Sequence, residues 1–391
     1  MMNMCRRLVL FCLAVFCSGC AIGNPVKSND AERPAGARPN IILIMADDLG
    51  YECLSCNGST SYQTPFLDKL ADTGMRFKYC YSTPLCTPSR VQIMSGQYNF
   101  RNYTRFGSMD PRITNFAHIL RSAGYATCVA GKWQLAGRPK GDGTYPKQAG
   151  FDEHCLWQVD RRESRYWNPV IQQNGKIRED LKDKYGPDVF CEYISDFMER
   201  HRNRRFFVYF PMTLTHGPFV PTPDSTGDAP KHKNNKKYFA DMVTYMDKIV
   251  GRIVGKLDEL GLRDNTLIMF TGDNGSPNGI VTQMGSKTVR GGKSQTTDAG
   301  THVPLIANWK GNIQSAEVCD NLIDFTDFLP TLAEVAGAEI PKHIKTDGRS
   351  FLPQLLGSKG NPRQWVFCHY QPMHGNKKLF ARYVHDKRWK L

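Results

Sequence analysis

The sequence predicts an α/β fold with a mixed, mostly parallel central sheet sandwiched by helices. Short apolar runs alternate with amphipathic segments, and the runs that indicate buried strands are NIILIMA (40–46), ATCVA (126–130), FFVYFPM (206–212) and NTLIMFT (265–271). Such alternation is typical of parallel strands joined by helices that cover both faces of a sheet. With 391 residues, 40% of them hydrophobic, the chain can bury a large core.

Four segments between or beside these runs are predicted helices. Thr64-Pro65 begins a helix that ends near Gly74, and the other two amphipathic segments span 114–124 and 239–261. In PLCTPSRVQIMSGQ (84–97), Thr87 is the predicted N-cap and Pro88 the first helical residue, with the helix running to about Ser95 before Gly96. Cys86 would then lie at the positive end of a helix, which lowers a thiol pKa and favours a bound anion.

Each predicted strand is followed by polar residues. In chain order these are Asp47 and Asp48, then Lys132 in Gly-Lys-Trp, then His216, then Asp273 with Asn274. Open α/β sheets place their chemistry beyond the carboxyl ends of the strands. We therefore expect the four clusters to meet in one site.

The acidic clusters indicate a metal site. Adjacent carboxylates at Asp47 and Asp48 repel each other unless a cation or a proton intervenes. Taken alone, this pair could equally form a turn or a helix cap. Together with Asp273 and Asn274 it provides an all-oxygen ligand set suited to Ca²⁺ or Mg²⁺.

The basic residues indicate an oxyanion guest. Arg90, Lys132 and Lys293 are permanent cations, His216 is titratable, and Lys293 follows a flexible Arg-Gly-Gly segment. Each residue alone is more commonly a solvated lysine or a structural histidine. Around one hard metal ion, the set predicts a sulfate or phosphate group attached to a larger molecule.

The chain has 13 cysteines, and those beyond the first 20 residues are scattered rather than regularly spaced. Cys53-x-x-Cys56 is a weak zinc or redox pattern, and an ordinary loop is the favoured interpretation. In an exported protein Cys86 could form a disulfide. Cys-x-Pro-x-Arg at a helix start nevertheless favours an anion-handling nucleophile over a bridge.

The N-terminus predicts export. Residues 1–19 form a signal peptide with a basic start and an apolar stretch, and Ser-Gly-Cys20 resembles a bacterial lipoprotein cleavage site. Cys20 would be lipidated, with plain secretion as the alternative, and residues 20–38 would form a flexible tether. We expect an exported bacterial protein, periplasmic or on the cell surface and attached to the membrane by lipid.

The sequence Cys86-Thr87-Pro88-Ser89-Arg90 resembles the signature of the formylglycine-dependent (type I) sulfatases, which belong to the alkaline phosphatase-like superfamily. The resemblance runs from about Pro39 to Leu391 and includes ADDLGY, Gly-Lys-Trp, THGPF, TGDNG and GGKSQTTDAGTHVPLI in family order. It implies a catalytic domain over 39–363. It also implies that 364–391 is an incomplete C-terminal subdomain, because relatives usually continue through a small four-stranded sheet and a helix.

The resemblance also implies a mechanism. A maturation enzyme oxidises Cys86 to formylglycine, whose hydrate attacks the sulfur of a sulfate ester; the alcohol leaves, and sulfate is then expelled. The residues that match the family's Ca²⁺ ligands, besides the modified residue 86, are Asp47, Asp48, Asp273 and Asn274. The remaining matches are Arg90, which supports residue 86, Lys132 and Lys293, which hold sulfate oxygens, and His216, the general acid for the leaving oxygen.

One position departs from the family. Relatives usually have Gly-Lys-Trp-His, whereas this chain has Gln134, which hydrogen-bonds in the substrate site but takes up no proton near neutral pH. Either another group is the base, or a subfamily functions without one, or turnover is slow.

The net charge of +14 favours a polyanionic partner, and a sulfated carbohydrate is the expected substrate. Nucleic acid is disfavoured because no recognition motif accompanies the charge. Two alternatives stay open from the sequence: a phosphate or phosphonate ester hydrolase of the same superfamily, and a non-catalytic protein that binds sulfated glycans.

Overall fold

The computed structural model describes residues 38–137, 141–160, 162–227, 231–372 and 380–391. The predicted signal peptide, Cys20 and the tether up to residue 37 lie outside the described residues.

In the described part of the chain, ten strands form one sheet. Their spatial order is β12 (Glu317–Asp324), β2 (Met75–Tyr81), β11 (His302–Asn308), β8 (Thr266–Gly272), β1 (Asn40–Ala46), β7 (Phe206–Pro211), β3 (Ala126–Lys132), β4 (Glu153–Trp157), β5 (Ile171–Gln173) and β6 (Lys176–Ile177). The five central strands from β8 to β4 are parallel, whereas β11, β5 and β6 introduce antiparallel pairs. The predicted mixed, mostly parallel sheet is confirmed.

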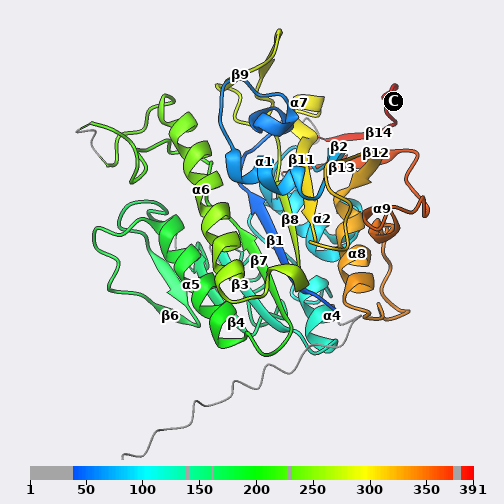
Figure 1. Cartoon of the computed structure of the whole chain (residues 1–391), viewed down its shortest axis with the longest axis horizontal. Helices are drawn as coiled ribbons and strands as arrows, with labels where there is room; N and C mark the ends of the chain where they lie inside the picture. Colours follow the sequence, from blue (N-terminus) through cyan, green and yellow to red (C-terminus); the bar gives the residue numbers. More distant parts are fainter. Residues whose placement is uncertain (1–37, 138–140, 161, 228–230, 373–379) are drawn as a thin grey trace, which may run out of the picture. The chain divides into compact units, whose positions relative to one another are not determined.

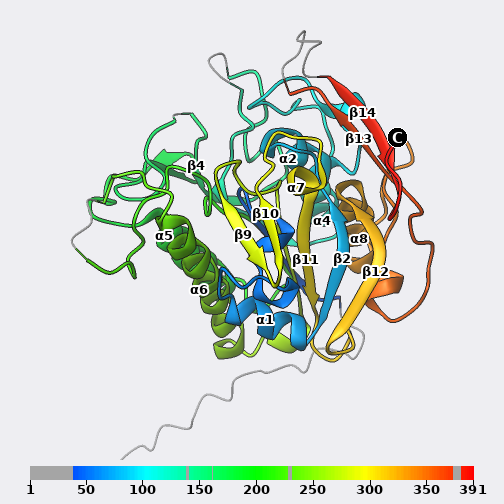
Figure 2. The same cartoon turned by 90° about the horizontal axis from the view of Figure 1, so that it is seen from above.

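Helices cover both faces of this sheet (Figures 1 and 2). One face carries α1 (Pro65–Asp72), α5 (Gly186–Arg200) and α6 (Tyr238–Glu259), and the other carries α2 (Cys86–Ser95), α4 (Phe116–Ser122) and α8 (Phe328–Val335). Alternate residues of β1 point to the two layers: Ile42 and Ile44 enter the core beneath α6, and Ile41 and Leu43 enter the core beneath α2 and α8. Among the described helices, none is both long and apolar enough to cross a membrane.

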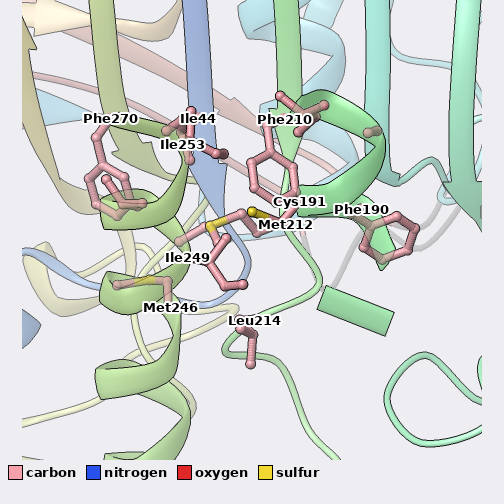
Figure 3. Packing of buried hydrophobic residues seen from close by; sticks show 14 of the residues in the cluster. Ile44, Phe190, Cys191, Phe210, Met212, Leu214, Met246, Ile249, Ile253 and Phe270 are labelled. Atoms are coloured by element: carbon pink, nitrogen blue, oxygen red, sulfur yellow. The ribbon is translucent and has the colours of Figure 1, made fainter. Parts of the chain in front are cut away.

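Figure 3 shows the first of these cores. Ile44, Phe210 and Phe270 project from three neighbouring strands and pack against α5 and α6. The residues of α5 and α6 in this view are Phe190, Cys191, Met246, Ile249 and Ile253. This packing fixes the strands whose carboxyl ends carry the polar clusters.

The remaining elements lie around the sheet. They are the short helices α3 (Asn99–Asn102), α7 (Asp298–Thr301) and α9 (Leu352–Leu355), the hairpin of β9 (Val281–Met284) and β10 (Lys287–Arg290), and the hairpin of β13 (Val366–Tyr370) and β14 (Ala381–His385). The 3₁₀ turns are η1 (Tyr51–Cys53), η2 (Ser55–Asn57), η3 (Arg263–Asn265) and η4 (Phe325–Asp327).

The predicted start of helix α2 was wrong by two residues. The helix begins at Cys86 with Leu85 as its N-cap, and Thr87 does not cap it. Pro88 fits inside the first turn because the first backbone N–H groups of a helix have no partner within the helix. The Thr87 hydroxyl instead accepts a hydrogen bond from the backbone N–H of Gly107 at 3.2 Å.

Candidate active site

The four predicted polar clusters meet beyond the carboxyl ends of the central strands of the sheet. Strands β8, β1, β7 and β3 are neighbours and parallel, so their carboxyl ends lie together. Asp47 and Asp48 follow β1, Asp273 follows β8, and Lys132 is the last residue of β3. His216 comes from the segment after β7, and its Nε2 lies 3.6 Å from an Asp48 carboxylate oxygen.

Backbone hydrogen bonds extend the strand pairing into this site. Asp47 donates its N–H to the Leu214 carbonyl at 2.7 Å, and Thr215 donates to the Asp47 carbonyl at 2.7 Å. Asp273 donates to the Ala46 carbonyl at 2.9 Å. The acidic residues therefore stand on a backbone that the sheet holds in place.

Gly131 allows β3 to lie against β7 just before Lys132. Its φ is +118°, and a Cβ at this position would lie 2.1 Å from the Pro211 carbonyl oxygen. Only glycine tolerates both this conformation and this approach. The glycine of the Gly-Lys-Trp segment thus positions the lysine.

Each carboxylate of the site is paired with a cation. The Lys132 ammonium lies 2.9 Å from both oxygens of Asp47, and the Lys293 ammonium lies 2.6 Å from Asp48 Oδ2. Arg90 donates from Nε and Nη2 to Asp273 Oδ2 at 3.2 and 3.1 Å. The predicted anion-binding cations and metal-binding carboxylates therefore share one buried space.

Burial and charge oppose each other at these carboxylates. For Asp273, burial and the charge of Asp47 outweigh Arg90 and raise the pKa to about 7. For Asp47, burial is outweighed by the cations, Lys132 foremost, and the pKa lies well below its usual range. The carboxylates repel one another, and a divalent cation among them would relieve this repulsion.

The donor set fits such a cation. The ligand atoms of Asp47, Cys86 and Asp273 lie within 4.8 Å of one another, and so do those of Asp47, Asp48 and His216. Asn274 donates from Nδ2 to Asp48 Oδ1 at 2.9 Å. Its Oδ1 is buried and has no hydrogen-bond partner among the described residues. An orphaned buried oxygen beside carboxylates is what a hard-cation site requires.

Cys86 is the first residue of α2 and is 2% exposed. Its thiol donates a hydrogen bond to Gln134 Oε1 at 3.4 Å. Gln134, the residue that replaces the family's usual histidine, therefore lies in contact with residue 86. The predicted lowering of the thiol pKa was wrong: burial raises the pKa of Cys86, and the nearby Lys132 offsets this only in part.

The described cysteines are all free thiols, so Cys86 forms no disulfide with any of them. Cys53 and Cys56 lie in two consecutive 3₁₀ turns, and the Cys53 thiol lies 3.1 Å from the Ser276 hydroxyl. This placement agrees with an ordinary loop.

His216 presents one defined nitrogen to the site. Its Nδ1 lies 2.6 Å from the Gly217 carbonyl oxygen and must donate there, which leaves Nε2 facing Asp48. Burial lowers the pKa of His216 to about 4, although Asp48 and Asp47 oppose this shift. Without a bound anion, the imidazole is neutral at pH 7.

Arg165 belongs to the site although the sequence patterns did not identify it. Its Nη1 lies 3.5 Å from an Asp47 oxygen, its side chain is 7% exposed, and its guanidinium stacks 3.9 Å from the centroid of the Trp157 ring. It comes from the loop after β4, a strand next to β3. The one sequence feature that could have indicated Arg165 is the partly apolar run EHCLW (153–157), because the polar residues after a further strand of the sheet were candidates for the same site.

Comparisons with known proteins identify the family of the chain. The profile of the Sulfatase family matches residues 39–338, and that of N-sulphoglucosamine sulphohydrolase, C-terminal, matches residues 293–391. Arylsulfatase A of Homo sapiens is 32% identical over 362 residues, which cover 84% of this chain and 70% of that protein. N-acetylgalactosamine-6-sulfatase of Sus scrofa is 30% identical over 352 residues, with coverages of 81% and 66%.

The crystal structure of Ps i-CgsB in complex with k-i-k-neocarrahexaose has a similar fold. The TM-score is 0.77 at 25% identity, and the match covers 90% of this chain and 83% of that one. The non-catalytic alternative is therefore not supported. The chain belongs to the sulfatase family of the alkaline phosphatase-like fold and is a sulfuric ester hydrolase.

Proposed function

We propose that the protein hydrolyses sulfate esters of a sulfated carbohydrate, using a formylglycine made from Cys86 and a bound Ca²⁺. The observation that carries this proposal is the position of Cys86, whose sulfur lies within 4.8 Å of ligand oxygens of Asp47 and Asp273. The hydrated formylglycine would supply the attacking hydroxyl group. A maturation enzyme is required to make it.

Asp47, Asp48, Asp273 and Asn274 would hold the Ca²⁺. The orphaned Asn274 Oδ1 supports this assignment because an oxygen ligand needs a free lone pair aimed into the site. When bound, Ca²⁺ supplies positive charge that favours the extra negative charge on sulfate oxygens in the transition state.

The chain's own cations would bind and orient the sulfate group. Lys132 is fully buried against Asp47, whereas the Lys293 side chain is 18% exposed. Both ammonium groups carry three donors, so each retains donors for sulfate oxygens while it holds a carboxylate. Arg90 anchors α2, and thereby residue 86, to Asp273.

His216 would protonate the leaving oxygen from Nε2. Because burial lowers its pKa to about 4, this role requires that the bound sulfate raises the pKa by its negative charge. Gln134 would hydrogen-bond to residue 86 without taking its proton, so the base for sulfate release lies elsewhere or is water.

The carbohydrate substrate is supported by the net charge of +14 and by the names of the relatives. Export and lipid attachment at Cys20 are further proposals, supported by the leader sequence alone. They predict that Cys20→Ala moves the protein from the membrane fraction to the soluble fraction of its host.

The direct test is peptide mass spectrometry across residue 86 on protein produced together with a formylglycine-generating enzyme. We expect an aldehyde at residue 86 and release of inorganic sulfate from a sulfated sugar. Cys86→Ala should fold normally and release none. A thiol at residue 86 in active enzyme, or preference for the phosphate ester of the same alcohol, would overturn the proposal.

A further inference from the structure

A pocket of about 390 Å³ adjoins the active site. Arg165 lines it and lies 3.5 Å from Asp47, and Gly217 of the wall directly follows His216. Its volume is at the small end of the range for small-molecule sites, about 300–1,000 Å³. The pocket therefore suits one sugar unit rather than a long stretch of chain.

Hydrogen bonds preform the wall of this pocket. The Tyr166 hydroxyl donates to the His216 carbonyl, and Trp167 donates from Nε1 to the Pro221 carbonyl at 2.8 Å. The wall and the segment that carries His216 are thus tied together. A ligand in the pocket would be held at a fixed distance from the reacting centre.

The innermost basic group of the pocket is Arg165. It is buried and stacked on Trp157, and its Nη1 makes no hydrogen bond with a described residue although it is ion-paired with Asp47. The Arg165 side chain lines the pocket and therefore adds positive charge at its inner end, beside the active site.

The outer part of the pocket is also basic. Arg162 and Lys231 line it and are exposed, and Glu163 is the one acidic residue among its described lining residues. The Lys231 ammonium lies 4.4 Å from the centroid of the Trp167 ring and 3.7 Å from the exposed carboxylate of Asp183. The excess of basic over acidic side chains in the lining suits a ligand that carries a negative charge.

We propose that this pocket binds the sugar unit next to the one that carries the scissile sulfate, and that it selects a second anionic group, carboxylate or sulfate, on that unit. The inference rests on the proposed function but assigns residues outside the sulfate-binding set. It makes the enzyme selective for polyanionic glycans, whereas a small aryl sulfate would occupy the active site alone.

The test separates binding from catalysis. Binding to Cys86→Ala protein is measured by calorimetry with three disaccharides of N-acetylgalactosamine 6-sulfate, linked to glucose, to glucuronic acid or to sulfated glucose. Loss of one or two charge-assisted hydrogen bonds corresponds to about a tenfold change in affinity. We expect binding of one or both dianionic disaccharides at least about tenfold tighter, and the tighter one identifies the group as carboxylate or sulfate.

Two surface variants assign this preference to the pocket. Arg162→Ala/Lys231→Ala should remove the preference and leave turnover of 4-nitrophenyl sulfate by the mature enzyme unchanged. Lys248→Ala is a matched control: this lysine also pairs with an exposed carboxylate, Asp224, and lies 5.2 Å from the centroid of the Tyr245 ring, but it does not line the pocket. It should change neither property.

Equal affinity for the three disaccharides, or no binding of any, would overturn the pocket proposal. An unchanged preference in the double variant would also overturn it. Failure of the mature wild-type enzyme to hydrolyse any sulfate ester would instead contradict the proposed function, because the binding comparison does not depend on turnover.

Discussion

Arg90 of α2 donates two hydrogen bonds to a single oxygen of Asp273, at 3.2 Å from Nε and 3.1 Å from Nη2. Its Nη1 also donates to the Lys132 carbonyl at 3.1 Å. One buried side chain therefore joins the helix that begins with Cys86 to the ends of β8 and β3. Its contribution to stability should be far larger than that of a surface arginine with the same number of bonds.

Replacement of Arg90 by alanine should destabilise the protein by ~3–5 kcal/mol, because a buried ion pair loses one partner. Asp273, whose pKa burial already raises, must then take up a proton to stay buried. Arg200 is the control: it bonds both oxygens of Glu153, but its side chain is 43% exposed. Arg200→Ala should cost at most about 1 kcal/mol. Denaturant unfolding monitored by circular dichroism measures both, and equal losses would contradict the argument.

Calcium should stabilise the folded protein. A ligand that binds only the folded state at 100 times its dissociation constant raises the unfolding free energy by about 2.7 kcal/mol. Chelation should therefore lower the melting temperature, and added Ca²⁺ should restore it more fully than Mg²⁺. This measurement is independent of activity.

Asn274→Ala tests the site assigned to this ion. Loss of the orphaned Oδ1 should reduce or abolish the Ca²⁺-dependent shift, whereas Asn274→Asp should retain it because an oxygen ligand remains. Asn312→Ala, at an exposed asparagine elsewhere, should leave the shift unchanged. A full Ca²⁺ response in Asn274→Ala would place the ion elsewhere.

The elements that could be predicted are those with a local signal. Runs such as 40–46 and 265–271 are continuously apolar because their strands are buried on both faces, and they match β1 and β8 within a residue. Strand β2 escaped notice because MRFKYCY mixes charged and apolar residues, and β11 runs antiparallel between two strands that are distant in sequence. The hydrophobic pattern of a strand does not reveal which distant strands it pairs with or in which direction.

The residues of the active site also fall into those that the sequence could predict and those that it could not. Asp47, Lys132 and Asp273 could be found because each stands at the end of an apolar run, where the sheet brings strand ends together. Arg165 lies on an irregular loop, and only the folded chain brings it to Asp47. The pKa of Cys86 was misjudged because a helix start is visible in sequence, whereas the burial that outweighs it is not.

Gln134→His should increase sulfate release and change its pH dependence. Gln134 accepts a hydrogen bond from residue 86, and a histidine there would place a group with an ordinary pKa near 6.5 beside it. General base catalysis contributes about 10²–10⁴-fold, so we expect a gain of up to about 10²-fold and a new inflection near neutral pH. Gln134→Ala, which removes the hydrogen bond without adding a base, is the control.

Steady-state rates from pH 5 to pH 9 measure this effect, with the aldehyde content at residue 86 determined for each variant. An unchanged profile in Gln134→His at equal aldehyde content would show that the enzyme already has an efficient base elsewhere.

Glu153 should stabilise the protein in a pH-dependent way that is separate from the active site. Burial opposes its ionisation, but hydrogen bonds from Arg200 and His201 outweigh burial and lower its pKa from 4.5 to about 2. Since the folded state binds this proton less readily than the unfolded state, the stabilisation is complete above about pH 4.5 and disappears as the pH falls toward 2.

Glu153→Gln should therefore be less stable than wild type at pH 6, and the difference should shrink steadily as the pH falls below 4.5. Thermal unfolding of both proteins between pH 3 and pH 7 measures this, with Glu339→Gln as the control at an exposed glutamate. The control should change the stability by at most about 0.5 kcal/mol, as substitutions at exposed positions usually do. A constant difference between wild type and Glu153→Gln would mean that Glu153 acts through neutral hydrogen bonds and packing, because only a charge-dependent contribution is lost on protonation.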